Sequence, residues 1–169
     1  VFTRSGKMQV VKVDNKVFVE KDIIHVAVFK KKDARTVYNV IYRDGKLGTS
    51  YIKRFAVTGV TRDKFYEITQ GKPGSHLLYF SANPNGEAET VSIVLRNTGQ
   101  AKKLKWELDF ADLQVKGRGV KGNIVTKYNV LKVELKEKGV STLKPRKIWF
   151  DDTVLKLNLD GRGKLLGAF

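Results

Sequence analysis

Apolar and polar residues alternate one by one in several short segments of the chain. In the segment KLKWELDF, residues 103–110, Leu104, Trp106 and Leu108 alternate with charged side chains. A period of two places neighbouring residues on opposite faces of a β-strand, one face buried and the other in water. The same alternation occurs in residues 90–96, 130–136 and 154–160. No window of ten or more residues has the 3.6-residue apolar period of a helix, so the sequence predicts an all-β protein with antiparallel sheets.

Glycine-containing turns separate these segments and recur at a nearly constant spacing. The turns RSGK, RDGK, PNGE and LDGRGK contain Gly6, Gly45, Gly86 and Gly161. Gly after Asp or Asn tolerates the positive φ of a tight hairpin turn. Gly6 and Gly45 are 39 residues apart, and Gly45 and Gly86 are 41 apart. Gly122 and Gly161 are again 39 residues apart. A period near 40 residues in an all-β chain predicts a repeat architecture, here of about four units.

The repeat indicates that residues 1–169 form a single propeller-like domain of stacked blades. One unit alone cannot cover its apolar face, so neighbouring units must pack against it. Blades of antiparallel strands satisfy both the period and the shortage of helix. An ordinary β-sandwich of about nine or ten short strands is the alternative. The chain begins VFTRSGK, within a predicted strand and without an initiator Met, so we expect a fragment of a longer disc or spiral.

Positive charge is concentrated in two blocks of the chain. There are 33 Lys and Arg against 17 Asp and Glu, a formal net charge of +16. Residues 1–72 contain 16 basic and 7 acidic side chains, and residues 102–147 contain 13 and 5. Such a field attracts polyanions, of which nucleic acid is the commonest in a cell, although a basic surface can also serve solubility alone. The chain has no Cys and no apolar run near 18 residues, so we expect no disulfide, no thiolate metal site and no membrane span.

The segment VKGRGVKGN, residues 115–123, combines three glycines with three cations. Gly117, Gly119 and Gly122 follow the G-x-G-x-x-G spacing of dinucleotide-binding loops. Such a loop needs a following helix whose N-terminus holds the pyrophosphate, but residues 123–135 read as a strand. We therefore expect a basic turn and no cofactor. Either its cations bind phosphate beside accessible main chain, or they face water in an ordinary hairpin turn.

This loop resembles a degenerate form of the gyrase box, Q-R-R-G-G-(K/R)-G, which belongs to the C-terminal domain of the DNA-cleaving subunit of bacterial gyrase. Four residues match the box: Arg118, Gly119, Lys121 and Gly122. Its Gln, its first Arg and one Gly are replaced by Lys116, Gly117 and Val120. Other segments are also similar to this domain and to its topoisomerase IV counterpart, namely FTRSGKMQVVKV, VIYRDGKLGTSYIKRF and KIWFDDTVLKLNLDGRGKLLGAF.

The resemblance implies a C-terminal β-pinwheel domain from the DNA-cleaving subunit of a type IIA topoisomerase, an ATP-dependent enzyme of the cytoplasm and nucleoid. In that family the pinwheel is a propeller-like disc or open spiral of blades. Its basic edge binds and bends duplex DNA for the catalytic core of the same parent chain, which works with a separate ATPase subunit. The degraded box favours topoisomerase IV over gyrase as the parent. The resemblance implies no catalytic activity for the domain itself.

The resemblance and the charge pattern together predict the residues that contact DNA. Lys53 and Arg54, in the segment YIKRF, are similar to a family strand that carries Lys-Arg to the DNA-facing rim. Adjacent strand residues face opposite sides of a sheet, so only one of the two is expected to meet DNA through its strand face. The run of three lysines at 30–32 forms either a phosphate-binding or a solvated loop. The predicted contacts are Lys30, Lys31, Lys32, Lys53, Arg54, Lys116, Arg118, Gly119, Lys121, Gly122 and Lys127.

No other residues of the chain indicate chemistry. Asp151 and Asp152 have no third carboxylate or His nearby and are predicted to form a turn, and the two histidines are isolated in sequence. Trp106 and Trp149 lie in alternating segments, where we expect packing between units, with base stacking as the alternative. The competing function is an interaction propeller that binds protein or RNA through its basic surface.

Overall fold

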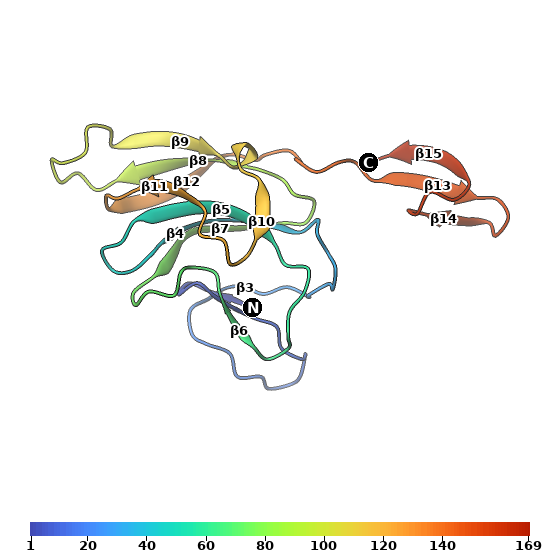
Figure 1. The fold of residues 1–169 in the computed structure, drawn as a ribbon, viewed down its shortest axis with the longest axis horizontal. Helices are drawn as coiled ribbons and strands as arrows, with labels where there is room; N and C mark the ends of the chain where they lie inside the picture. The colour runs from blue at the N-terminus through green and yellow to red at the C-terminus, as the bar shows by residue number, and fades with distance from the viewer.

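The fold is built almost entirely of β-strands (Figure 1). A computed structural model describes residues 1–169 and contains 15 strands, one 3₁₀-helix at Phe110–Asp112 and no α-helix. All strand pairs are antiparallel except the pair of β10 and β5. None of its helical residues forms a segment with the length and hydropathy of a membrane span. The predicted all-β class is confirmed.

Four sheets follow one another along the chain, and none closes into a barrel. The first sheet has the order β3-β1-β2-β6 and consists of β1 (Phe2–Thr3), β2 (Lys7–Gln9), β3 (Ile23–His25) and β6 (Phe65–Glu67). The central sheet has the order β10-β5-β4-β7 and consists of β4 (Val37–Arg43), β5 (Ser50–Ala56), β7 (His76–Asn83) and β10 (Val115–Gly117), with β11 (Asn123–Thr126) also paired to β5. The third sheet has the order β12-β8-β9 and consists of β8 (Thr90–Leu95), β9 (Lys105–Asp109) and β12 (Val130–Glu137). The C-terminal sheet has the order β14-β13-β15 and consists of β13 (Lys147–Asp151), β14 (Lys156–Asn158) and β15 (Lys164–Ala168).

The sheets share one plan of strand order. In each sheet the first strand along the chain lies in the middle, with the second strand on one side and the third on the other. The first and central sheets have a further strand beyond their second strand. It comes from the connection between the second and third strands of the next sheet, because β6 pairs with β2, and β10 and β11 pair with β5. Each of these two sheets is therefore completed by its successor.

This arrangement of open, blade-like sheets agrees with the predicted pinwheel-like fold class. It contains four sheets, whereas a β-sandwich has two that face each other. That residues 1–169 form one domain of 40-residue repeats stays a prediction.

Two hydrophobic cores lie on the two faces of the central sheet. Tyr51 and Phe55 enter the core shared with the first sheet, whereas Ile52, between them in β5, enters the core shared with the third sheet. This division follows from the period of two along a strand. Trp106 packs against the second of these cores, as predicted. The buried residues of the first core are Phe2, Met8, Val40, Tyr42, Tyr51, Phe55, Val57, Ile68 and Leu77, and those of the second are Ile41, Ile52, Ala88, Val91, Ile93, Leu95 and Phe110.

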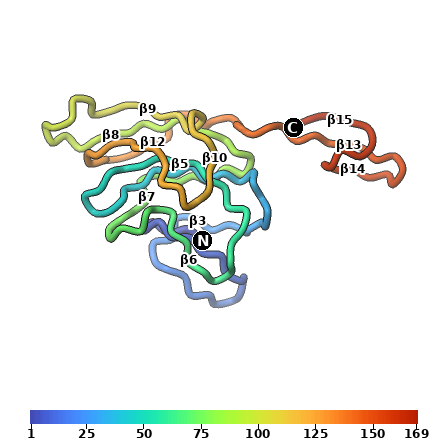
Figure 2. Tube along the Cα trace, viewed as in Figure 1, coloured from blue at the N-terminus to red at the C-terminus, as the bar shows by residue number.

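The C-terminal sheet projects from the rest of the molecule (Figures 1 and 2). None of its residues belongs to either core, and Leu155 and Leu157 are 76% and 64% exposed. The carboxylate of Asp151 accepts hydrogen bonds from the backbone N–H groups of Thr153 and Val154. These bonds form the predicted turn after β13.

The predicted glycine turns have the expected backbone conformation. Gly6, Gly45, Gly86 and Gly161 have φ angles of +85°, +88°, +69° and +92°. Residues with a side chain rarely adopt such angles, so the turn predictions are confirmed.

Burial of His25 is expected to make the stability of the fold depend on pH. Its ring centroid lies 5.9 Å from that of Phe2 and 5.4 Å from that of Phe80, and burial lowers the pKa of His25 below its ordinary value of 6.5. As the pH falls through about 6.5, the unfolded chain binds a proton that the folded chain does not bind. The free energy of unfolding should therefore decrease with falling pH until the lowered pKa of the folded state is reached.

Urea denaturation at a series of pH values between about 7.5 and 5.5 measures this effect. The His25→Phe variant should lose the part of the pH dependence that this ring contributes, and the amino terminus of Val1, whose pKa burial also lowers, should keep its own part. The control variant His76→Gln should keep both parts. An unchanged pH dependence in His25→Phe would contradict the assignment.

Candidate nucleic-acid interface

Residues 118–122 form a loop between β10 and β11, and we call it the glycine loop. Both strands pair with the same edge of β5. β10 runs parallel to it, with Val115 opposite Arg54, and β11 runs antiparallel, with Asn123 opposite Ile52. Gly117, the last residue of β10, lies opposite Ala56, so the glycine loop leaves the edge of β5 at Ala56 and returns to it at Ile52, and Lys53 lies in the stretch of β5 that the loop spans.

The side chain of Lys53 holds the glycine loop through hydrogen bonds to its carbonyl groups. Its Nζ donates hydrogen bonds to the carbonyl oxygens of Arg118 at 2.6 Å and of Val120 at 2.8 Å, and to that of Ile68. An ammonium group has three donors, and burial without partners would cost several kcal/mol. Lys53 is only 4% exposed, so these three carbonyls provide its partners. The Nζ also lies 5.4 Å from the ring centroids of Tyr42 and Phe55.

Two further contacts fix the second half of the glycine loop. The hydroxyl of Tyr42 donates a hydrogen bond to the carbonyl oxygen of Lys121 at 2.7 Å. Gly122 has a φ of +91°, and a Cβ at this position would lie 2.3 Å from the carbonyl oxygen of Ile52. Only glycine allows the loop to approach β5 this closely. Around Gly119, in contrast, no atom lies within 4 Å of a Cβ position, so its main chain is open to an approaching ligand.

The cations of the glycine loop make cation–π contacts with aromatic rings. The guanidinium carbon of Arg118 lies 4.0 Å from the ring centroid of Tyr66, and one of its Nη atoms donates to the carbonyl of Gly59 at 2.8 Å. The Nζ of Lys121 lies 4.8 Å from the ring centroid of Tyr51. Cation–π contacts hold these charges in place without removing them from water.

A hollow of about 240 Å³ lies between the glycine loop and β5. Its lining includes the carboxylate residue Asp112 together with Lys116 and Asn123. Lys53 and Arg54 of β5 also belong to the lining.

Arg54 is buried on the other face of β5 and is 1% exposed. Its guanidinium donates to Asn39 Oδ1 at 2.9 Å, to the carbonyl of Gly86 at 3.0 Å and to Thr142 Oγ1 at 3.0 Å. Glu89 lies in the same network, because it accepts a hydrogen bond from Asn39 Nδ2 at 2.8 Å. Arg54 thereby connects the central sheet to the chain around the third sheet.

The placement of Lys53 and Arg54 differs from the expectation for DNA contacts. The two side chains face opposite sides of the sheet, as predicted. Both faces of this sheet are covered by a core, however, so neither charged group reaches the surface. Their roles in the structure are to bind the carbonyl groups of loops.

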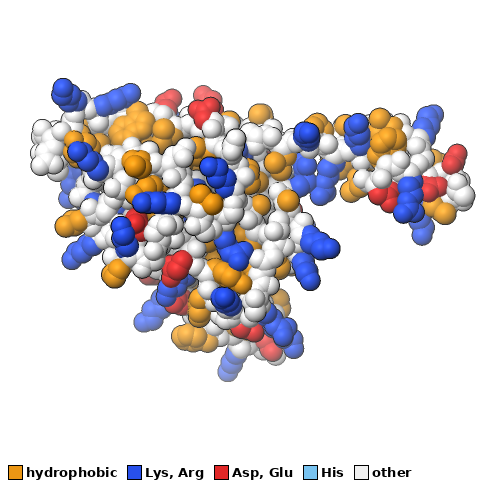
Figure 3. All heavy atoms as spheres, in the orientation of Figure 1, with side chains coloured by type: hydrophobic (Ala, Val, Ile, Leu, Met, Phe, Trp, Pro, Cys, Tyr) orange, Lys and Arg blue, Asp and Glu red, His pale blue; other side chains and the backbone are white.

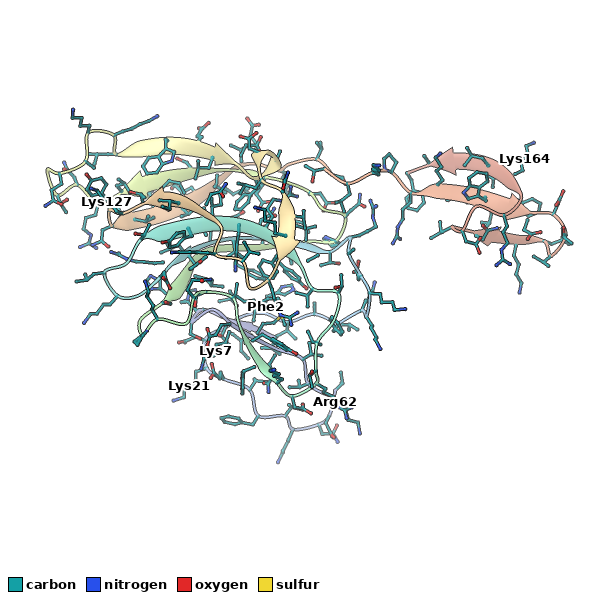
Figure 4. The ribbon with its side chains drawn as sticks, viewed as in Figure 1. Phe2, Lys7, Lys21, Arg62, Lys127 and Lys164 are labelled. Carbon is teal, nitrogen blue, oxygen red and sulfur yellow. The ribbon has the colours of Figure 1, made fainter.

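The other predicted contacts lie at the surface but in different places. Lys116, Lys121 and Lys127 are exposed, as are the three lysines at 30–32 in the connection between β3 and β4. Figure 3 shows Lys and Arg side chains over both the main body and the C-terminal sheet, not gathered on one edge. Figure 4 shows Lys127 at the end of the sheets that is distant from β10. DNA contact by these residues stays a prediction.

The aromatic supports of the glycine loop were not among the predicted site residues. Tyr42, Tyr51 and Tyr66 come from β4, β5 and β6, at least about 50 positions before the loop in the sequence. No local pattern around a single Tyr indicates that a cation from a distant loop will stand on its ring.

One comparison with known proteins gave a match. The family model described as "Topoisomerase C-terminal domain, Bacteroidota" matches residues 1–138, the segment that contains the first, central and third sheets. No curated protein and no solved structure showed significant similarity.

Replacing Lys53 by Met tests the support of the glycine loop. The variant keeps the apolar stem but leaves three carbonyl groups without their donor, so we expect a loss of about 1–3 kcal/mol in the free energy of unfolding. Trypsin should also cleave faster after Arg118 and Lys121, because the loop loses two of its hydrogen bonds. Lys116→Met, at an exposed position, is the control and should change neither quantity. Equal behaviour of the two variants would contradict this role of Lys53.

Replacing Gly122 by Ala tests the close approach of the loop to β5. The positive φ and the clash with Ile52 predict a destabilisation of at least about 1 kcal/mol in thermal or urea denaturation. Gly119→Ala, where the added methyl group meets open space, should leave the stability nearly unchanged. Tolerance of Ala at position 122 would show that the loop is free to move away from the strand.

Proposed function

The chain belongs to the family of topoisomerase C-terminal domains of Bacteroidota, and from that premise we propose that it binds duplex DNA through the glycine loop and the cations around it. The observation that carries the proposal is a loop whose main chain is fixed while its cations stay at the surface. Lys53 and Tyr42 hold the carbonyl groups of the loop, and Arg118 and Lys121 stand on aromatic rings.

A loop of this kind suits the DNA backbone better than base edges. Lys and Arg neutralise phosphates and release counterions, and the open main chain at Gly119 offers an N–H donor to a phosphate oxygen. The chain has no α-helix that could enter the major groove. The proposed readout is therefore of backbone and shape, not of base sequence.

Binding of this type also supports bending of the duplex. Bending 20–30 base pairs by tens of degrees costs about 1–6 kcal/mol, which several phosphate contacts can offset. We propose that the domain positions a bent DNA segment beside the catalytic core of its parent topoisomerase, which acts with an ATPase subunit in the nucleoid. The degenerate glycine loop favours the DNA-cleaving subunit of topoisomerase IV as the parent, with that of gyrase as the second choice.

The spread of cations over the visible surface favours a second candidate. A charge of +16 that is not confined to one edge also suits an acidic protein or an RNA. The two candidates differ in their preference for duplex DNA over single strands, and in whether one loop dominates the affinity.

A mobility-shift titration with duplex DNA tests the proposal. Affinity should fall steeply between about 50 mM and 500 mM salt, because binding releases counterions. The variant Lys116→Ala/Arg118→Ala/Lys121→Ala should bind more weakly, and its slope of log K against log salt should be shallower by up to about 3. Its thermal stability should change little, since these side chains lie outside both cores.

A variant with the same loss of charge elsewhere provides the control. Lys156→Ala/Arg162→Ala/Lys164→Ala removes three exposed cations from the C-terminal sheet. It should keep most of the affinity. Equal losses in both triple variants, salt-independent binding or a preference for single strands would overturn the assignment to the glycine loop.

A further inference from the structure

The connections at one end of the central and third sheets contain several cations and a single carboxylate. We call these connections the turn end, and they are residues 44–49, 68–75, 96–104 and 127–129. Figure 1 shows them at the end of the sheets away from the C-terminal sheet. The exposed cations of the turn end are Lys46, Lys72, Arg96, Lys102, Lys103 and Lys127. Its carboxylate is that of Asp44, which is 2% exposed and lies 3.0 Å from the Nζ of Lys72.

The connections at the opposite end of the same sheets have a different composition. Residues 57–64, 84–89 and 110–114 lie there, and each of these connections contains at least one acidic residue. Cations occur over the whole surface, but exposed carboxylates are missing from the turn end. The turn end therefore attracts a polyanion more strongly than the opposite end does.

One large apolar side chain of the turn end is exposed. Leu47 is 85% exposed, in the turn between β4 and β5, and it lies between Lys46 and a glycine, Gly48. Single exposed leucines are common on protein surfaces. The exposure of Leu47 indicates a function only because its main chain is fixed and because cations surround it.

Hydrogen bonds from two neighbouring segments fix the main chain on both sides of Leu47. The Nε of Arg43, the last residue of β4, donates to the carbonyl oxygen of Gly48 at 3.1 Å. The N–H of Gly45 donates to the hydroxyl of Ser75 at 2.8 Å, and Gly45 has a φ of +88° that favours glycine. The turn therefore presents Leu47 in one backbone conformation.

Cations lie on both sides of this turn. Lys72 precedes β7, the strand that pairs with β4, and its ion pair with Asp44 holds it beside the turn. Lys127 follows β11, which pairs with β5 up to Ser50, the first residue after the turn. Leu47 is therefore an apolar group with a cation on the β4 side and another on the β5 side.

The glycine loop lies next to the same turn. Tyr42 and Tyr51 form a cross-strand pair close to the turn, one in β4 and the other in β5. The hydroxyl of Tyr42 binds the carbonyl oxygen of Lys121, and the Nζ of Lys121 lies 4.8 Å from the ring centroid of Tyr51. A duplex bound at the glycine loop is therefore close to Leu47.

We propose that Leu47 inserts between two base pairs of the bound duplex and kinks it. This inference rests on the proposed DNA binding and adds the place and the means of bending. An apolar group between cations fits a partner whose anions surround an apolar interior, and duplex DNA has its phosphates outside and its stacked bases inside. Leucine is among the side chains that bend DNA by insertion from the minor groove. Phosphate contacts of the flanking cations offset the cost of unstacking.

Three substitutions of Leu47 separate insertion from electrostatic attraction. Leu47→Ala removes the inserted group, Leu47→Phe keeps a large apolar group, and Leu47→Lys adds a cation in its place. Leu155→Ala is the matched control, because Leu155 is 76% exposed and belongs to the C-terminal sheet. Leu47 lies outside both cores, so all variants should unfold at the temperature of the wild type.

A labelled duplex of about 25 base pairs with a central TA step, which unstacks easily, reports both bending and insertion. Energy transfer between dyes at its two ends measures bending, and 2-aminopurine in place of the central adenine fluoresces more strongly when it unstacks. Saturating wild type should increase both signals.

The variants should divide into two groups. Leu47→Phe and Leu155→Ala should keep both increases, whereas Leu47→Ala should lose most of them. Leu47→Lys should also lose them, although it should bind at least as tightly as the wild type, with a slope of log K against log salt steeper by about 1.

Three outcomes would overturn the proposal. Duplex binding by the wild type without either increase, or with increases that Leu47→Ala shares, would exclude insertion and leave DNA binding intact. Full signals from Leu47→Lys would show that charge at this turn bends the duplex without an inserted apolar group. A wild type that binds no duplex, or that prefers RNA or an acidic protein, would remove the proposed function and this inference together.

Discussion

The structure depends on two adjacent cations buried on opposite faces of one strand. Lys53 and Arg54 lie in β5, between the two cores, and both direct their hydrogen-bond donors to oxygen atoms of other segments. A buried cation is stable only where acceptors surround it, so each cation dictates where the neighbouring chain must run. The central sheet thereby determines the path of the glycine loop on one side and of the chain around Gly86 and Thr142 on the other.

This use of charge separates two functions of basic residues in the same chain. Buried cations contribute to the conformation of loops, whereas exposed cations produce the field that attracts polyanions. Lys53 and Arg118 meet in the glycine loop, the first binding the carbonyl group of the second. The net charge of +16 therefore overstates the charge that is available to a partner.

The sequence was sufficient to predict the local features of the fold, but it was not sufficient to predict the contacts between distant segments. Alternation around Trp106 predicts its strand and its packing, and the turns at Gly6 and Gly45 follow from glycine's tolerance of positive φ. The burial of Lys53 could not be predicted in the same way, because two of its acceptors lie 65 and 67 residues further along the chain. The alternation of side chains along a strand predicts that Lys53 and Arg54 face opposite sides of the sheet. It does not predict that a hydrophobic core covers each of these sides.

The completion of the first and central sheets by later segments has a consequence for synthesis on the ribosome. β5 leaves the ribosome early, but its edge stays unpaired until residues 115–126 have also left the exit tunnel. Until then the ammonium group of Lys53 lacks two of its hydrogen-bond acceptors, the carbonyl groups of Arg118 and Val120. The nascent chain therefore cannot finish its blades one at a time in N-to-C order. A truncation placed between two sheets would leave the upstream one unfinished, so boundaries for shortened versions of this domain belong after the donated strand and not before it.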